Sequence, residues 1–111
     1  MPSAPDAASA GRRLLVVDDD AAFCAALARA MGRRGFEVTV AHDVDGARAA
    51  AEVVAPTHAI VDLRMPGASG LALVPDLRAA DPDMRIVVLT GYASIATAVE
   101  AIKLGKHAPP A

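Results

Sequence analysis

The sequence contains little of what several classes of protein require. Its 111 residues include one cysteine, no tryptophan, one tyrosine and two phenylalanines. A single cysteine excludes an internal disulfide framework. No apolar run approaches the roughly 18 residues that a membrane-spanning helix needs, so we expect no membrane partner.

Neither sign of charge is in large excess. Lys and Arg total 11, Asp and Glu total 13, and the formal net charge is −2. Proteins that bind nucleic acid carry a basic patch, and the pairs Arg12-Arg13 and Arg33-Arg34 are too small and scattered to form one. We therefore expect no binding of nucleic acid through this chain.

Apolar residues, in contrast, are abundant. They make up 54% of the chain, which is enough for the core of one domain. The first residues, PSAPDAASAG, lack the apolar segment of a signal peptide. We expect residues 1–12 to be a flexible leader, and the simplest location for the protein is the cytoplasm.

Short apolar runs alternate with longer stretches of helical period along the chain. The short runs predict strands buried on both faces of a parallel sheet, at 14–17, 37–40, 59–61 and 86–89. The longer stretches predict helices at about 21–31, 44–54, 71–80 and 94–104. Asp20 is the expected N-cap of the first helix, and Pro75 kinks the third or delays its start. This alternation predicts a doubly wound α/β fold whose sites gather at the carboxyl ends of the strands.

Polar side chains follow three of these strands. Asp18, Asp19 and Asp20 come after the first strand, Asp62 ends the third and Thr90 ends the fourth. Carboxylates packed closely repel one another, and the cost is offset when they hold a cation. Hard oxygen ligands of this kind suit Mg²⁺. A metal beside an aspartate suits phosphoryl transfer, in which the aspartate oxygen attacks and Thr90 hydrogen-bonds a phosphoryl oxygen.

Three stretches together carry a resemblance to a known family. VVDDD, DLRMPGASG and VVLTGYASIATAVEAIKLG resemble the receiver domain of bacterial two-component response regulators. The sequence after Thr90 is similar to that of the redox-responsive RegA/PrrA/ActR type. The match covers roughly residues 14–105 and implies a flavodoxin-like fold, a signalling role rather than an enzyme, transcriptional control in the full-length family, and a sensor histidine kinase as partner.

The resemblance also implies roles for single residues. Asp62 resembles the phospho-acceptor, and Thr90 the hydroxyl that swings toward the phosphoryl group. Asp19 and Asp62 would bind Mg²⁺ directly, Asp18 would act through water, and the backbone carbonyl of Arg64 would complete the protein's share of the ligands.

The end of the chain departs from the family pattern. Where receivers continue with a fifth strand and a fifth helix, this chain reads KHAPPA. Proline donates no hydrogen bond to a sheet, so this stretch does not predict a central strand. We expect an incomplete receiver at 13–105 with an irregular tail at 106–111. The fourth strand would then be an exposed edge that allows self-association.

Other readings remain open at this point. The acidic triplet also suits a plain helix N-cap cluster. It resembles the first motif of haloacid-dehalogenase-type phosphatases too, with Asp18 as nucleophile, Asp20 as acid/base, and Thr90 and Lys103 in the later motifs. A third reading is a decayed or non-phosphorylated receiver fragment.

Two further features have ordinary explanations. AHDVDGARAAAE mimics a calcium loop, but Ala41 occupies the first ligand position and a strand precedes it. Cys24 lies beside Phe23 in an Ala-rich helix, which predicts a buried inert thiol.

Overall fold

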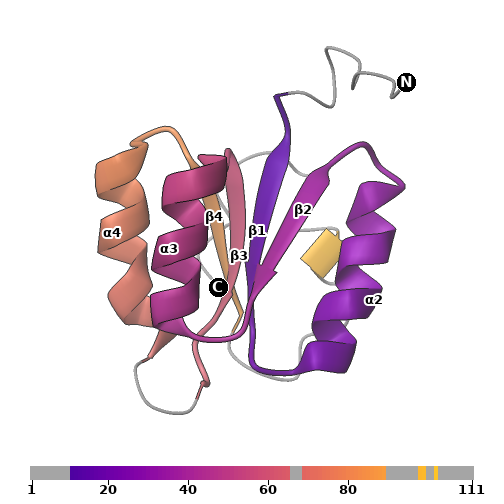
Figure 1. Ribbon diagram of the computed structural model, residues 1–111, viewed down its shortest axis with the longest axis horizontal. Coiled ribbons are helices and arrows are strands. Elements are labelled where there is room, and N and C mark those ends of the chain that lie inside the picture. The colour runs from indigo at the N-terminus through magenta and orange to yellow at the C-terminus, as the bar shows by residue number, and fades with distance from the viewer. Residues whose placement is uncertain (1–10, 66–68, 90–97, 100–101, 103–111) are drawn as a thin grey trace.

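A parallel sheet lies at the centre of the structure (Figure 1). The computed structural model describes residues 11–65, 69–89, 98–99 and 102. Within these residues the strands are β1 (Arg13–Val17), β2 (Glu37–Ala41), β3 (His58–Asp62) and β4 (Arg85–Leu89). Their order is β2-β1-β3-β4, and every neighbouring pair is parallel. This order is that of a flavodoxin-like sheet, so the predicted fold class is confirmed.

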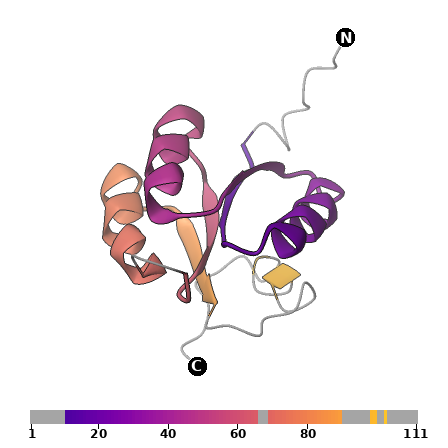
Figure 2. The ribbon, with the colours of Figure 1, turned by 60° about the horizontal axis from the view of Figure 1, so that its bottom comes forward.

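Helices cover both faces of the sheet. Helix α2 (Ala21–Gly32) lies on one face, whereas α3 (Val44–Val54) and α4 (Leu73–Ala80) lie together on the other (Figure 2). Asp20 caps α2 as predicted, since its carboxylate accepts a hydrogen bond of 3.0 Å from the N–H of Phe23. Among the described residues, no helix has the length and apolar character needed to cross a bilayer.

The third helix, α4, begins at Leu73, slightly later than the predicted start at about residue 71. A 3₁₀ turn (Gly70–Ala72) occupies the place of its first predicted residues. Pro75 is then the third residue of α4, within the first turn, where a backbone N–H has no partner inside the helix. Proline therefore delays the start of the helix, which was one of the two outcomes expected of it. Of the predicted helix at 94–104, Ala98, Val99 and Ile102 are described, and they are helical and buried.

Alternate residues of each strand enter two different apolar cores. Leu14 and Val16 of β1 contact the core beneath α2, whereas Leu15 and Val17 contact the core beneath α3 and α4. All four are at most 1% exposed. Complete burial of such a side chain contributes about 1.5–3 kcal/mol. An uninterrupted apolar run is therefore what a central strand with helices on both sides requires.

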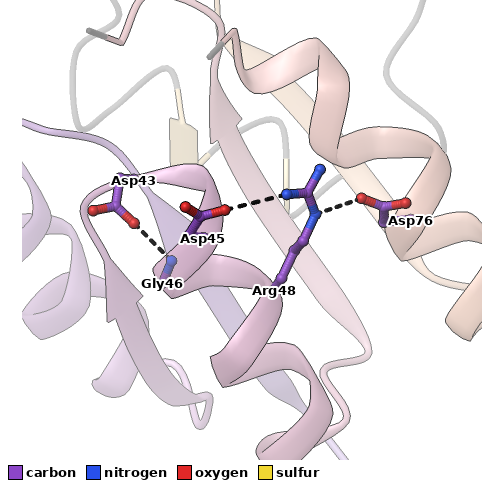
Figure 3. Close-up of polar contacts among 5 residues, drawn as sticks. All are labelled: Asp43, Asp45, Gly46, Arg48 and Asp76. Atoms are coloured by element: carbon purple, nitrogen blue, oxygen red, sulfur yellow. Dashed lines mark hydrogen bonds and ion pairs between the residues drawn. The ribbon is translucent and has the colours of Figure 1, made fainter. Parts of the chain in front are cut away.

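An ion-pair network joins α3 to α4 at the surface (Figure 3). Arg48 lies 2.7 Å from Asp76 of α4 and 3.3 Å from Asp45 of its own helix. Asp43 caps α3 by accepting a hydrogen bond of 2.6 Å from the N–H of Gly46. The stretch that mimics a calcium loop is thus the end of β2 followed by a capped helix.

Candidate functional site

Three carboxylates meet at the carboxyl edge of the sheet, between its two central strands. Asp18 directly follows β1, and Asp62 is the last residue of the adjacent β3. One carboxylate oxygen each from Asp18, Asp19 and Asp62 lie within 4.8 Å of one another. The chain leaves β1 toward β2 on one side and returns to β3 on the other, which is where open α/β sheets bind ligands.

Burial differs among the three side chains. Asp62 is 7% exposed and Asp18 is 9% exposed, whereas Asp19 is open to solvent. Burial raises the pKa of Asp18, and the charges of Asp62, Asp19 and Asp20 raise it further. The N–H of Asp20 opposes this rise by donating a hydrogen bond of 2.9 Å to Asp18 Oδ1. The cluster without a cation is therefore electrostatically unfavourable, and a bound cation would offset the cost.

The turn after β3 orients the carboxylate of Asp62. The N–H of Arg64 donates a hydrogen bond of 3.1 Å to Asp62 Oδ1, so residue 64 lies beside this carboxylate. The N–H of Leu63 donates to the carbonyl of Leu89 at 2.9 Å. This bond ties the end of β3 to the end of β4, the strand after which Thr90 follows in the chain. Thr90 itself lies outside the described residues, as does Lys103.

Gly70 has a positioning role that the sequence reading missed. A Cβ atom built on Gly70 would overlap the backbone carbonyl oxygen of Asp62 and lie 2.8 Å from Val61 Cγ1. Ser69 donates a hydrogen bond of 3.4 Å from its hydroxyl to the carbonyl of Leu63 and accepts one of 3.1 Å from the N–H of Leu71. The loop can pack against the backbone of Asp62 only with glycine at position 70. The signal in the sequence is the glycine that closes DLRMPGASG, Gly70.

Cys24 is the buried thiol that the sequence predicts. It is 1% exposed, and burial followed by the charge of Asp18 raises its pKa to about 11. A thiol in this state is protonated at neutral pH and a poor nucleophile. Its Sγ donates a hydrogen bond of 3.3 Å to the carbonyl of Asp18.

The donor set suits a divalent cation. Three carboxylates from one strand end and its neighbour supply hard oxygen ligands and excess negative charge in a small volume. Mg²⁺ binds through one or two carboxylates and keeps several waters, so a half-open edge of this kind fits it. The plain N-cap reading explains Asp20, but it does not explain why Asp62 of β3 lies against Asp18.

Comparison with known proteins decides the family. The response regulator receiver domain family matches residues 14–108 of this chain. The chain belongs to the response regulator receiver family. A curated relative, the photosynthetic apparatus regulatory protein RegA of Rhodobacter capsulatus, is 51% identical over 94 residues, which are 85% of this chain and 51% of RegA. This receiver thus spans about half the length of that relative, and the resemblance to the RegA type is confirmed.

Solved structures agree with the fold and the family. A response regulator of Burkholderia pseudomallei with a phosphorylated aspartic acid, a calcium ion and citrate has a TM-score of 0.69 and 47% identity, over 85% of this receiver and 55% of that chain. A chain from the complex of histidine kinase ThkA with response regulator protein TrrA, a protein of Thermotoga maritima, has a TM-score of 0.66 and 30% identity, over 74% of this receiver and 71% of that chain. The phosphatase alternative gains no support from these comparisons.

Proposed function

We propose that this receiver domain accepts a phosphoryl group on Asp62 from a phosphohistidine of a sensor histidine kinase, with Mg²⁺ bound beside it. The observation that carries the proposal is the meeting of Asp18, Asp19 and Asp62 within 4.8 Å at the carboxyl edge of the sheet. The family supplies the reaction class, and the carboxylates supply the nucleophile and the ligands.

The residues of the site divide the work of this reaction. A carboxylate oxygen of Asp62 attacks phosphorus in line, the bond from phosphorus to the histidine nitrogen breaks, and an acyl phosphate forms on Asp62. Mg²⁺ neutralises charge on the phosphoryl oxygens when bound. Asp19 and Asp62 would bind it directly, Asp18 would act through water, and the carbonyl of Arg64 would add a ligand. Thr90 supplies a hydroxyl to a phosphoryl oxygen.

The wider role follows from the family. We assign the chain to signalling rather than to catalysis with turnover, and to the cytoplasm, where receiver domains are typically located. The ThkA–TrrA complex supports a histidine kinase as the partner, since one of its chains is similar to this one. Control of transcription is proposed for a longer protein that includes such a domain, because RegA is about twice the length matched here.

Phosphorylation is tested by intact-mass spectrometry after treatment with acetyl phosphate. We expect one added phosphoryl group in MgCl₂ and none in EDTA. Asp62→Asn should abolish the label, whereas the control Asp83→Asn, at an exposed carboxylate outside the cluster, should label as the parent does. An Asp62→Asn protein that labels fully would refute the assignment, and a label mapped to Asp18 would favour the phosphatase chemistry.

Self-association through the sheet edge is a separate proposal. Within the described part of the chain, β4 is an outer strand, and its residues Ile86, Val87 and Leu89 are apolar and mostly buried. An outer strand whose edge is not covered by another segment pairs readily with another chain. Light scattering across a concentration series tests the proposal, and a strictly monomeric protein at every concentration would contradict it.

A further inference from the structure

We infer that His42 is a positioning residue for the metal-ligand pair Asp18 and Asp19. His42 directly follows β2, and its Nδ1 lies 2.9 Å from the backbone carbonyl oxygen of Asp18. Because that oxygen can only accept a hydrogen bond, Nδ1 carries the proton in this contact. The inference rests on the metal site proposed above, and none of the motifs that led to that site includes His42.

Two consecutive residues hold the backbone of Asp18 at both of its polar groups. The N–H of Asp18 donates a hydrogen bond of 3.1 Å to the carbonyl of Ala41, and its carbonyl accepts from His42. The carbonyl of Asp18 belongs to the peptide bond that joins it to Asp19. The N–H of Asp18 belongs to the preceding peptide bond, and each peptide bond is planar. Hydrogen bonds to the planes on both sides of the Asp18 Cα therefore constrain φ and ψ of Asp18, and with them the direction in which the chain enters Asp19.

Asp19 depends on this arrangement more than Asp18 does. Asp18 is nearly buried and its carboxylate also accepts from the N–H of Asp20, whereas Asp19 is exposed and packing holds it less. Cys24 donates to the same carbonyl oxygen at 3.3 Å, but a thiol is a weak donor. Groups that orient metal ligands from outside typically change metal affinity by about 10–100-fold when they are removed.

An isosteric pair of variants tests the hydrogen bond apart from side-chain bulk. His42→Asn keeps a nitrogen donor attached to Cγ, and His42→Leu has the same shape without a donor. The full chain is titrated with MgCl₂ alone and followed by amide NMR shifts, with urea unfolding in EDTA as the measure of folding. We expect His42→Leu to weaken Mg²⁺ binding about tenfold and His42→Asn to stay within about threefold of the parent.

Controls separate the role of His42 from general damage. Arg48→Ala also removes a hydrogen-bonded, exposed side chain, but the partners shown for it are Asp45 and Asp76, so its Mg²⁺ affinity should equal that of the parent. His42→Ala is a second variant without the donor, and it takes the place of His42→Leu if the latter does not fold.

The outcomes distinguish this inference from the proposal on which it rests. Parental Mg²⁺ affinity in the variants without a donor would overturn the role of His42, as would equal weakening in His42→Asn and His42→Leu. A parent protein that shows no response to Mg²⁺ would instead overturn the metal site itself.

Discussion

Replacing Asp18 with asparagine should stabilise the metal-free protein at neutral pH and leave its stability unchanged in acid. The substitution keeps the shape of the side chain and the Oδ1 atom that accepts the hydrogen bond from Asp20. It removes one charge from a cluster that lies within 4.8 Å. The change therefore tests the electrostatic cost of the site without disturbing its hydrogen bonding.

The direction follows from the pKa of Asp18. Burial first, and the neighbouring carboxylates second, raise it above the ordinary 3.8, so the folded state holds this proton more tightly than the unfolded state. The free energy of unfolding of the metal-free parent should fall as pH rises from about the unfolded pKa of Asp18 through its raised folded pKa. The stability lost over this range should stay lost at neutral pH. Asp18→Asn has no such proton and should lack this decline.

The separation of the carboxylates sets the size of the expected stabilisation. Two unit charges 4.8 Å apart repel by about 3.5 kcal/mol at an effective dielectric constant of about 20. Asp19 is exposed, so solvent screens its share. We therefore expect a gain of about 1–2 kcal/mol for Asp18→Asn at pH 7.

Urea unfolding in EDTA from pH 3.5 to 8 measures this gain. The difference between the variant and the parent should be near zero at the acid end and grow with pH, and Asp83→Asn is the control at an exposed carboxylate. Saturating Mg²⁺ should reverse the order, because a ligand at 100 times its Kd adds about 2.7 kcal/mol to a native state that binds it. A difference that does not vary with pH, or a parent that is more stable at pH 7 in EDTA, would refute the reasoning.

The remaining predictions concern Asp19, Gly70, the core and the thiol. Asp19→Ala should abolish the rise in melting temperature that Mg²⁺ gives the parent, and calorimetry with and without the metal measures it. Gly70→Ala should cost about 1–3 kcal/mol in urea unfolding, because the new Cβ overlaps the carbonyl oxygen of Asp62; unchanged stability and labelling would show that the loop relaxes freely. Leu27→Ala should cost about 2–5 kcal/mol, since Leu27 is fully buried, while Val53→Ala, at a position 83% exposed, should change stability by less than about 0.5 kcal/mol. Cys24 should react with a thiol reagent at the rate of unfolding, and rapid labelling of the native protein would contradict its burial.

The sequence predicted those parts of the site in which an acidic residue lies at the end of a strand. Asp18 and Asp62 were predicted to converge because parallel strands end at one edge, and the structure places them together. His42 and Gly70 were missed for a physical reason. His42 acts through a backbone carbonyl and Gly70 through the absence of a side chain, and neither effect has a spacing that can be recognised without the fold.

Local patterns by themselves determined the elements of this protein. Apolar runs such as Leu14–Val17 predicted buried strands, and Asp20 predicted the start of α2, because burial on two faces and helix capping depend on neighbouring residues. The tertiary structure alone decided the strand order β2-β1-β3-β4 and the contact of Gly70 with Asp62. It also decided the hydrogen bond from His42 to Asp18, residues 24 positions apart. These features depend on which chain segments meet in space, and hydrophobic periodicity within one segment contains no information about its partner.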